Sequence, residues 1–341
     1  MEKQSKSIWQ EAGPQNDVAL SSRIRIARNF KDIPFPNNIS PIQAGDVKSR
    51  IRKLFGENKK LGLSYYELSN ISEMKRISWV EQHYMSIDIT KTPEISSLLL
   101  NADGSVAIMI NEEDHIRAQI LKSGFDLDSC IRQIEEIDEI LTSSNLIAYD
   151  ENLGYLTSCP TNLGEGVRAS VMLMIPALVT TGQLKGIIVN ANKLNIVVRG
   201  FYGEGQSGIN SIVQLSNKGS MGYSANDVVE TIKNVVQSIM DSERAARDVL
   251  YANRKSEIED RLMRSYGILK YARKMSQKEF YALIGNVWLA KYFDLIKDID
   301  YQEMIYLIIN SQDASLRTLN GGEENKLPIN HIRADFIRER L

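Results

Sequence analysis

Residues 21–28 read Ser-Ser-Arg-Ile-Arg-Ile-Ala-Arg, a run in which basic and apolar side chains alternate with a period of two. Successive side chains of a β-strand point to opposite faces, so a strand here places Arg23 and Arg25 on one face. The apolar residues Ile24 and Ile26 then occupy the other face. The two guanidinium groups indicate either a strand face with solvated arginines or one side of an anion site.

The first part of the chain around this segment mixes strand and helix patterns. Short β-branched runs predict a strand at Val106–Ile110 and a hairpin formed by Gly186–Asn190 and Leu194–Val198. Helical spacing predicts helices over Asp128–Leu141 and over Val167–Thr180, the second following a glycine-rich turn. We therefore expect an α+β fold for this part.

The pattern is almost wholly helical from Asn226, a plausible N-cap, to the end of the chain. Ser276–Glu279 has the sequence of a capping box, and Pro328 is placed to open a last helix. We therefore expect two domains, residues 1–225, with an upper boundary of up to about 255, and residues 226–341.

Composition and charge exclude several classes of protein. Of 341 residues, 43% are hydrophobic and 25% are charged, which are ordinary values for a globular protein and exclude disordered and fibrous chains. The 41 basic and 43 acidic residues nearly balance, so the whole chain is no generic binder of polyanions. An anion site must therefore be local.

The same composition predicts a cytoplasmic protein. No apolar run approaches the roughly 20 residues that a membrane span needs, and the charged N-terminus lacks the apolar region of a signal peptide. Cys130 and Cys159 are the only cysteines, which provides no disulfide framework and suits a reducing compartment.

Residues 111–117, Asn-Glu-Glu-Asp-His-Ile-Arg, place three carboxylates, one imidazole and one guanidinium directly after a predicted strand. The segment could be merely a polar turn. Metal ligation by Glu112, Asp114 and His115 is conceivable, but the spacing matches no zinc motif. We therefore expect no protein ligand for a metal here.

Residues 157–168, Thr-Ser-Cys-Pro-Thr-Asn-Leu-Gly-Glu-Gly-Val-Arg, are expected to end a strand and to turn on two glycines. Arg168 would then stand near the start of a helix, where free N–H groups and the helix dipole favour a phosphate. The absence of a Gly-Lys-Ser/Thr sequence argues against a Walker-type site. Cys159 is either a buried filler or a thiol whose pKa nearby arginines lower.

Residues 199–204, Arg-Gly-Phe-Tyr-Gly-Glu, close the predicted hairpin and present Arg199 and Glu204. Four segments at strand edges thus contribute arginine, and in residues 111–117 and 199–204 glutamates stand beside the arginines. This recurrence is not expected of a random surface.

In this order the four segments resemble the signature set of the guanidino (phosphagen) kinases. With a helical part after the catalytic half, and with Ala169–Met172 and the loop Tyr202–Gly205, the chain is similar to the bacterial protein-arginine kinases. The resemblance implies a guanidino-kinase catalytic domain, with an antiparallel sheet flanked by helices. An all-helical domain for regulation, substrate binding or dimerisation follows. Creatine and arginine kinases carry an additional N-terminal helical domain that helps select a small guanidine, whereas this sequence begins about 20 residues before the first motif.

The resemblance also implies the roles of individual residues. The residues that it assigns to ATP are Ser21, Ser22, Arg23, Ile24, Arg25, His83, Arg117, Arg168, Ala169, Ser170, Val171, Met172, Arg199, Gly200, Phe201, Tyr202, Gly203 and Glu204, with Arg28 as a further phosphate neighbour. Glu113 and Glu204 match the carboxylates that hold the substrate guanidinium, and Cys159 matches the active-site thiol. A planar, protonated guanidinium must be held by carboxylates that also remove its proton, and Glu113 is the preferred base.

The implied reaction is ATP-dependent phosphorylation of arginine side chains in proteins, as a stress-response or degradation mark. Mg²⁺ is expected with ATP, held through the nucleotide phosphates. The implied partners are protein substrates with accessible arginines, an activator protein, unfoldase–protease machinery and a second copy of the chain; no membrane and no direct nucleic-acid contact are expected. A kinase for free arginine or a small guanidine and a catalytically inactive adaptor are the alternatives.

Two departures from the family pattern carry their own expectations. Glu165 stands where the family commonly has threonine, and its carboxylate would weaken ATP binding unless it points to solvent or to an arginine. Residues 329–334 keep Arg333 and Ala334 of a phosphoarginine-sensing motif but have lost its first arginine and its aspartate. We expect weakened or absent activation by phosphoarginine.

Overall fold

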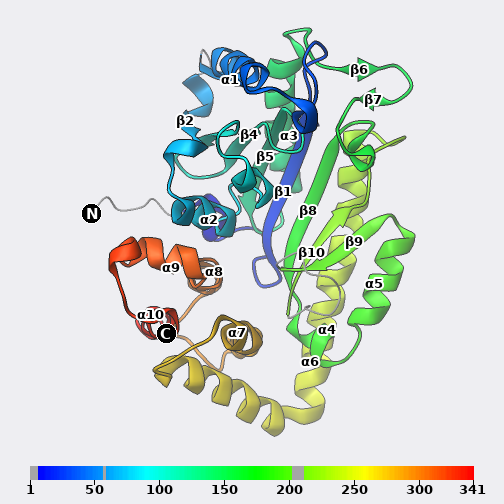
Figure 1. Ribbon diagram of the computed structural model, residues 1–341. Coiled ribbons are helices and arrows are strands. Elements are labelled where there is room, and N and C mark those ends of the chain that lie inside the picture. The colour runs from blue at the N-terminus through cyan, green and yellow to red at the C-terminus, as the bar shows by residue number, and fades with distance from the viewer. Residues whose placement is uncertain (1–6, 57–58, 202–210) are drawn as a thin grey trace.

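A twisted eight-stranded antiparallel sheet forms the centre of the computed structural model, which describes residues 7–56, 59–201 and 211–341 (Figure 1). In spatial order the strands are β2 (Leu63–Glu67), β3 (Ser97–Asn101), β4 (Val106–Ile110), β5 (Ile116–Ser123), β1 (Ala19–Arg28), β8 (Val167–Met174), β10 (Ile212–Asn217) and β9 (Ile196–Gly200). A separate hairpin joins β6 (Tyr149–Asp150) to β7 (Gly154–Tyr155). The expected α+β class with an antiparallel sheet is confirmed.

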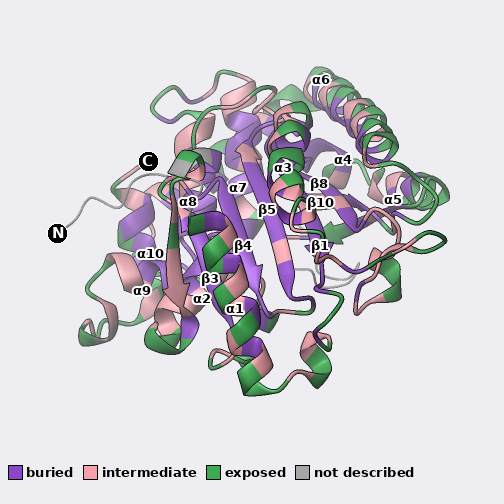
Figure 2. Ribbon diagram, turned by 90° about the horizontal axis from the view of Figure 1, so that it is seen from above, coloured by how far each residue is buried: buried purple, intermediate pink, exposed green. Residues whose placement is uncertain are grey.

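Helices cover the sheet and continue into a helical C-terminal region. They are α1 (Pro41–Gly56), α2 (Glu73–Glu81), α3 (Leu127–Thr142), α4 (Pro176–Thr180), α5 (Leu184–Lys193), α6 (Ala225–Tyr271), α7 (Gln277–Tyr292), α8 (Tyr301–Asn310), α9 (Asp313–Leu319) and α10 (Ile329–Arg338). Helix α3 packs on β1 and β5, and α6 packs on β8 and β10. The strands between these helices are mostly buried (Figure 2). No helix among the described residues is long and apolar enough to cross a bilayer.

The central strand β1 sets the arrangement of the site. It pairs antiparallel with β5 and β8, and its register places Arg25 opposite Arg168 and Ala27 opposite Arg117. Residues opposite each other in adjacent strands share a face of the sheet, so these arginines lie on the same side. The apolar residues Ile24 and Ile26 are buried on the other side, as their alternation predicts.

Two predicted elements are wrong. Residues 186–190 belong to helix α5 and form no hairpin strand; the antiparallel partner of β9 is β10. A short apolar run cannot by itself separate a strand from a half-buried helix, and here Ile188 is buried while Val189 is exposed. Residues 167–174 form strand β8, and Pro176 then opens the short helix α4. Arg168 therefore begins a strand and does not stand at a helix N-terminus.

The helical region begins slightly earlier than predicted. Ser224, two residues before the expected N-cap, caps α6 in a reciprocal capping box with Asp227. Helix α6 kinks at Arg254, which has non-helical torsion angles. Ser276 caps α7 and Pro328 precedes α10, as expected. The division of the chain into two domains near residues 225 to 255 stays a prediction.

Arg28 does not face the arginine side of the sheet, so its expected role as a phosphate neighbour is wrong. Its side chain is fully buried and donates two hydrogen bonds to Asp138 of α3, at 2.8 and 2.6 Å. It also donates to the carbonyl of Glu165, and its guanidinium lies 3.4 Å from the ring centroid of Tyr155. Arg28 therefore ties α3, the β6–β7 hairpin and the 157–166 loop together.

We expect Arg28→Lys to lower the free energy of unfolding by about 3 kcal/mol, because a lysine cannot reproduce the buried fork of donors. Urea unfolding measures the change. Arg50→Lys is the control, since Arg50 pairs with Asp32 and Asp46 at the surface and should cost less than about 1 kcal/mol. If Arg28 bound phosphate, its substitution would instead raise the KM for ATP at nearly unchanged stability.

Candidate active site

Arginines from strands β1, β5, β8 and β9 converge on one face of the sheet. Burial, followed by the charges of Arg117 and Arg168, lowers the pKa of Arg23 to about 9. Burial, followed by Arg199 and Arg117, lowers the pKa of Arg168 to about 10. The pKa of Arg25 is lowered well below its usual value by burial and by Arg23, Arg117 and Arg168. Groups that depress each other's pKa in this way lie close together, so these arginines form one cluster.

Among the described residues, the cluster carries more positive charge than its partners neutralise. Arg117 donates to both oxygens of buried Glu112, at 2.7 and 2.8 Å, and Arg168 donates to the hydroxyl of Ser216. The Nε atoms of Arg25 and Arg168 are buried without a hydrogen-bond partner among the described residues. Buried, mutually repelling cations are costly unless an anion joins them, so the cluster is suited to a polyanionic ligand.

A cavity of about 530 Å³ opens beside these arginines. Arg23 and Arg25 line it together with apolar and aromatic side chains, among them Met85, Ile87 and Phe201. Its size falls within the range of small-ligand pockets. The combination of cations and apolar wall suits a ligand with a charged end and a flat apolar end, such as a nucleotide.

His83 lies in this cavity with an uncommon backbone conformation. Its φ of 62° is left-handed, which non-glycine residues adopt rarely, and the Gln119 side chain donates to its carbonyl at 2.7 Å. Its ring contacts Trp9 and Phe201, with centroid distances of 5.2 and 5.6 Å. Burial, followed by the charges of Arg23 and Arg25, lowers the pKa of His83 to about 3. The imidazole is therefore neutral at physiological pH and offers an acceptor to a ligand.

Glu113 and Cys159 lie at the Arg168 side of the cluster. The charges of both groups act on Arg168, opposing the lowering of its pKa. Glu113 accepts a hydrogen bond from Asn162 at 3.3 Å, and the Cys159 sulfur lies 3.0 Å from the Thr161 hydroxyl. Burial raises the pKa of Glu113 above its usual value. The arrangement places a carboxylate of increased basicity and a thiol next to the cations.

The side chains that could have formed a metal site point to separate partners. Glu112 pairs with Arg117, and Asp114 accepts from Asn29 and from the Ser158 N–H. His115 accepts from the main-chain N–H of Phe30. In the described ranges no group of three or more His, Cys, Asp or Glu residues is placed to hold a metal ion.

Some residues assigned to ATP lie on the opposite face of the sheet. Register pairs Ile24 with Ala169 and Ser22 with Val171, and all four are buried in the core. The alternate positions Ser21, Ser170 and Met172 share the face of Arg23. Gly200 lies in β9, whereas Tyr202, Gly203 and Glu204 lie outside the described residues.

Other residues of the site carry no role in the sequence prediction. Asn162, which donates a hydrogen bond to Glu113, lies in the segment 157–168, so the sequence could have indicated it. Glu112, which the sequence offers only as a conceivable metal ligand, is the counter-charge of Arg117. Gln312 and Asp313 also line the cavity, but they come from the helical region far along the chain and have no local signal.

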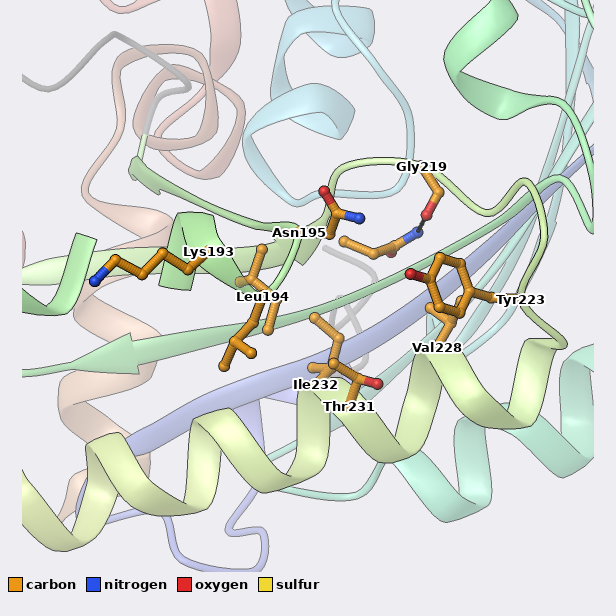
Figure 3. Close-up of a pocket in the computed structure, with 10 residues that line it drawn as sticks. Lys193, Leu194, Asn195, Gly219, Tyr223, Val228, Thr231 and Ile232 are labelled. Carbon is orange, nitrogen blue, oxygen red and sulfur yellow. Dashed lines mark hydrogen bonds between the residues drawn. The ribbon is translucent and has the colours of Figure 1, made fainter. Parts of the chain in front are cut away.

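A second cavity of about 260 Å³ lies between the start of α6 and residues 193–196 (Figure 3). Asn195, Tyr223 and Ile232 line it, and the Lys193 side chain extends away from the other side chains drawn. None of the described residues that line this cavity is an arginine. It therefore lacks the cationic wall that makes the first cavity a candidate for a polyanion.

Comparisons with known proteins place the chain in a family. Residues 46–246 match the family of the ATP:guanido phosphotransferase C-terminal catalytic domain, and residues 255–341 match the protein-arginine kinase McsB C-terminal domain. The protein-arginine kinase of Caldanaerobacter subterraneus is 39% identical over 95% of this chain and 97% of its own. That of Bacillus subtilis is 38% identical over 98% and 93%. The crystal structure of a lombricine kinase shares the fold, with a TM-score of 0.59 and 24% identity over 71% of this chain and 70% of its own.

Proposed function

The chain belongs to the protein-arginine kinases of the ATP:guanido phosphotransferase family, and on this premise we propose that it transfers the γ-phosphoryl group of ATP to arginine side chains of proteins. The observation that carries the proposal is the convergence of Arg23, Arg25, Arg117 and Arg168 beside Glu113. A single site thus offers cations for the donor and a carboxylate for the acceptor.

The arginines act on the phosphate end of the nucleotide. In phosphoryl transfer the charge is spread over the γ-phosphate oxygens and the leaving oxygen, so fixed guanidinium groups stabilise the transition state. Mg²⁺ bound to ATP would shield the charge of the phosphates, and we assign it no protein ligand. Because the arginines are positioned before the ligand arrives, little reorganisation is needed during the reaction.

Glu113 acts on the acceptor. Its carboxylate can receive the N–H donors of the substrate guanidinium and align one nitrogen with the γ-phosphorus. As the N–P bond forms, the bond from the γ-phosphorus to the bridging oxygen breaks and ADP leaves with that electron pair. The guanidinium proton passes to Glu113, whose raised pKa makes it a better base than an exposed glutamate.

Cys159 and Glu204 complete the proposed acceptor site. A thiolate at Cys159 would add negative charge beside the guanidinium, and Glu204 would supply the second carboxylate. A cytoplasmic location, a role as a stress-linked degradation mark, an activator protein, an unfoldase–protease partner and a homodimer are further proposals, and they rest on the family resemblance alone.

Incubation with ATP labelled at the γ-phosphate tests the proposed function. An unfolded protein should acquire label that is released in acid, as expected of a phosphoramidate, and an arginine-free polypeptide should acquire none. Transfer to free arginine but not to protein would support a small-guanidine kinase. Absence of transfer to either acceptor would support an inactive adaptor.

A further inference from the structure

The corner between α8 and α9 holds the end of α2, which forms one wall of the cavity. The Glu81 carboxylate accepts hydrogen bonds from the N–H groups of Ala314 and Ser315, at 3.1 and 2.6 Å. The Gln312 side chain donates to the Glu81 carbonyl at 3.1 Å, and the Gln82 side chain donates to Asn310 at 2.9 Å. Figure 1 shows α9 lying beside α2. These hydrogen bonds fix the chain directly before His83.

The same corner contributes side chains to the cavity. Gln312 and Asp313 line it, as does Gln277 at the start of α7. Gln312 is almost fully buried, whereas the Asp313 carboxylate is 61% exposed and pairs with buried Arg333. The pairing directs the Asp313 carboxylate and offsets part of its charge. The helical region is therefore a physical part of the candidate nucleotide site.

The chemistry of a nucleotide limits what Asp313 can contact. A carboxylate repels a triphosphate, and the phosphates have Arg23 and Arg25 to bind. The apolar side chains Met85 and Ile87 suit the base. The ribose joins these two ends. Its 2′- and 3′-hydroxyl groups can donate hydrogen bonds to a partly exposed carboxylate at the edge of the cavity.

We propose that the helical region forms the ribose-binding wall of the ATP site, an inference that rests on the proposed function. Asp313 accepts hydrogen bonds from the ribose hydroxyls, and Glu81 positions the part of the wall that contains His83. Asp313 is then a residue that determines nucleotide specificity. Glu81 contacts no nucleotide in this account; it acts by holding the end of α2 on α9. The helical region would thus take part in every catalytic cycle.

The ratio of the KM for 2′,3′-dideoxyATP to the KM for ATP tests the role of Asp313. In the parent protein we expect a ratio of about ten, since hydrogen bonds to a charged group are stronger than neutral ones. Asp313→Ala should reduce the ratio to about one, with kcat for ATP nearly unchanged. Asp313→Asn, which keeps an acceptor for Arg333, should reduce it to an intermediate value and guards against a folding defect. Asp260→Ala, at an exposed α6 residue paired with Arg264, is the control and should keep the parent ratio.

Glu81→Gln tests the positioning role separately. It keeps the shape but loses one of the two acceptors, so we expect the KM for both nucleotides to rise several-fold and their ratio to stay at the parent value. An unchanged ratio in both Asp313 variants would overturn the ribose assignment, and an unchanged KM in Glu81→Gln would overturn the positioning role. Both results are measured in a parent protein that transfers phosphate. A parent protein that transfers none would instead contradict the proposed function, so the two failures are distinguishable.

Discussion

Replacing Glu113 by glutamine is expected to reduce the rate of arginine phosphorylation by about 10³-fold, because an amide can neither take the guanidinium proton nor hold the cation by charge. ATP binding should remain, since Glu113 lies at the acceptor side of the arginine cluster. Measured kcat for a protein acceptor and a separate titration with ATP give the two readings. Glu135→Gln, an exposed change on α3, is the matched control and should leave both unchanged.

The pH dependence of the reaction gives an independent check on Glu113. Burial raises the pKa of its carboxyl group, so the base becomes protonated, and the rate falls, at a higher pH than an ordinary glutamate would give. The logarithm of kcat/KM should therefore decline as pH falls through this raised pKa. In Glu113→Gln the residual activity should lack this decline. A Gln variant that keeps the parent rate and the parent pH profile would assign the base elsewhere.

Replacing Arg25 by methionine is expected to abolish ATP use and to stabilise the ligand-free protein. Arg25 is buried among Arg23, Arg117 and Arg168, and its Nε has no partner among the described residues. Removing this charge relieves repulsion and desolvation, and methionine fills a similar volume. We expect kcat/KM for ATP to fall by about 10³-fold. A gain of about 1 kcal/mol would raise the unfolding midpoint by about 2 °C for a chain of this size.

Thermal unfolding with and without ATP measures both consequences. The parent protein should be stabilised by ATP, whereas Arg25→Met should start from a higher midpoint and gain nothing from the nucleotide. Arg50→Met is the control, because Arg50 lies at the surface in pairs with Asp32 and Asp46 and should leave the ATP effect intact. A lower midpoint together with unchanged ATP use would mean that Arg25 supports the fold and not the ligand.

The spacing of apolar residues identified the strands and helices that have one polar and one apolar face. In β1 the alternation of Arg23 and Arg25 with apolar residues is visible in the letters, and in α3 the apolar stripe from Ile131 to Leu141 is buried as predicted. The run at residues 186–190 was misassigned because three consecutive apolar residues fit a strand and a short helix equally well. In residues 167–174 one face is wholly apolar, and the other carries Met172 and Met174 beside Arg168 and Ser170. Polar and apolar residues therefore do not alternate clearly enough to separate a strand from a helix.

The arginines of the site were predictable from the sequence. Each belongs to a strand, and the pairing of the strands brings these arginines to one face of the sheet. The contribution of the helical region was not predictable. Glu81 and Ser315 are separated by 234 positions and meet only because α9 docks on α2. Arg333 was expected to belong to a degenerate ligand motif, yet it is buried and donates to Ser311, Met275 and Asn330. Arg333→Ala would therefore disturb packing, and weakened phosphoarginine activation stays a prediction.

A crystal structure of the protein with a non-hydrolysable ATP analogue and an arginine-containing peptide tests the central claim most directly. The decisive quantity is the distance between the γ-phosphorus and the nearest guanidinium nitrogen of the peptide. We predict about 3 to 3.5 Å, with the triphosphate on Arg23, Arg25 and Arg168 and the guanidinium on Glu113. A nucleotide bound away from the arginine cluster, or a peptide guanidinium without contact to Glu113, would contradict the account.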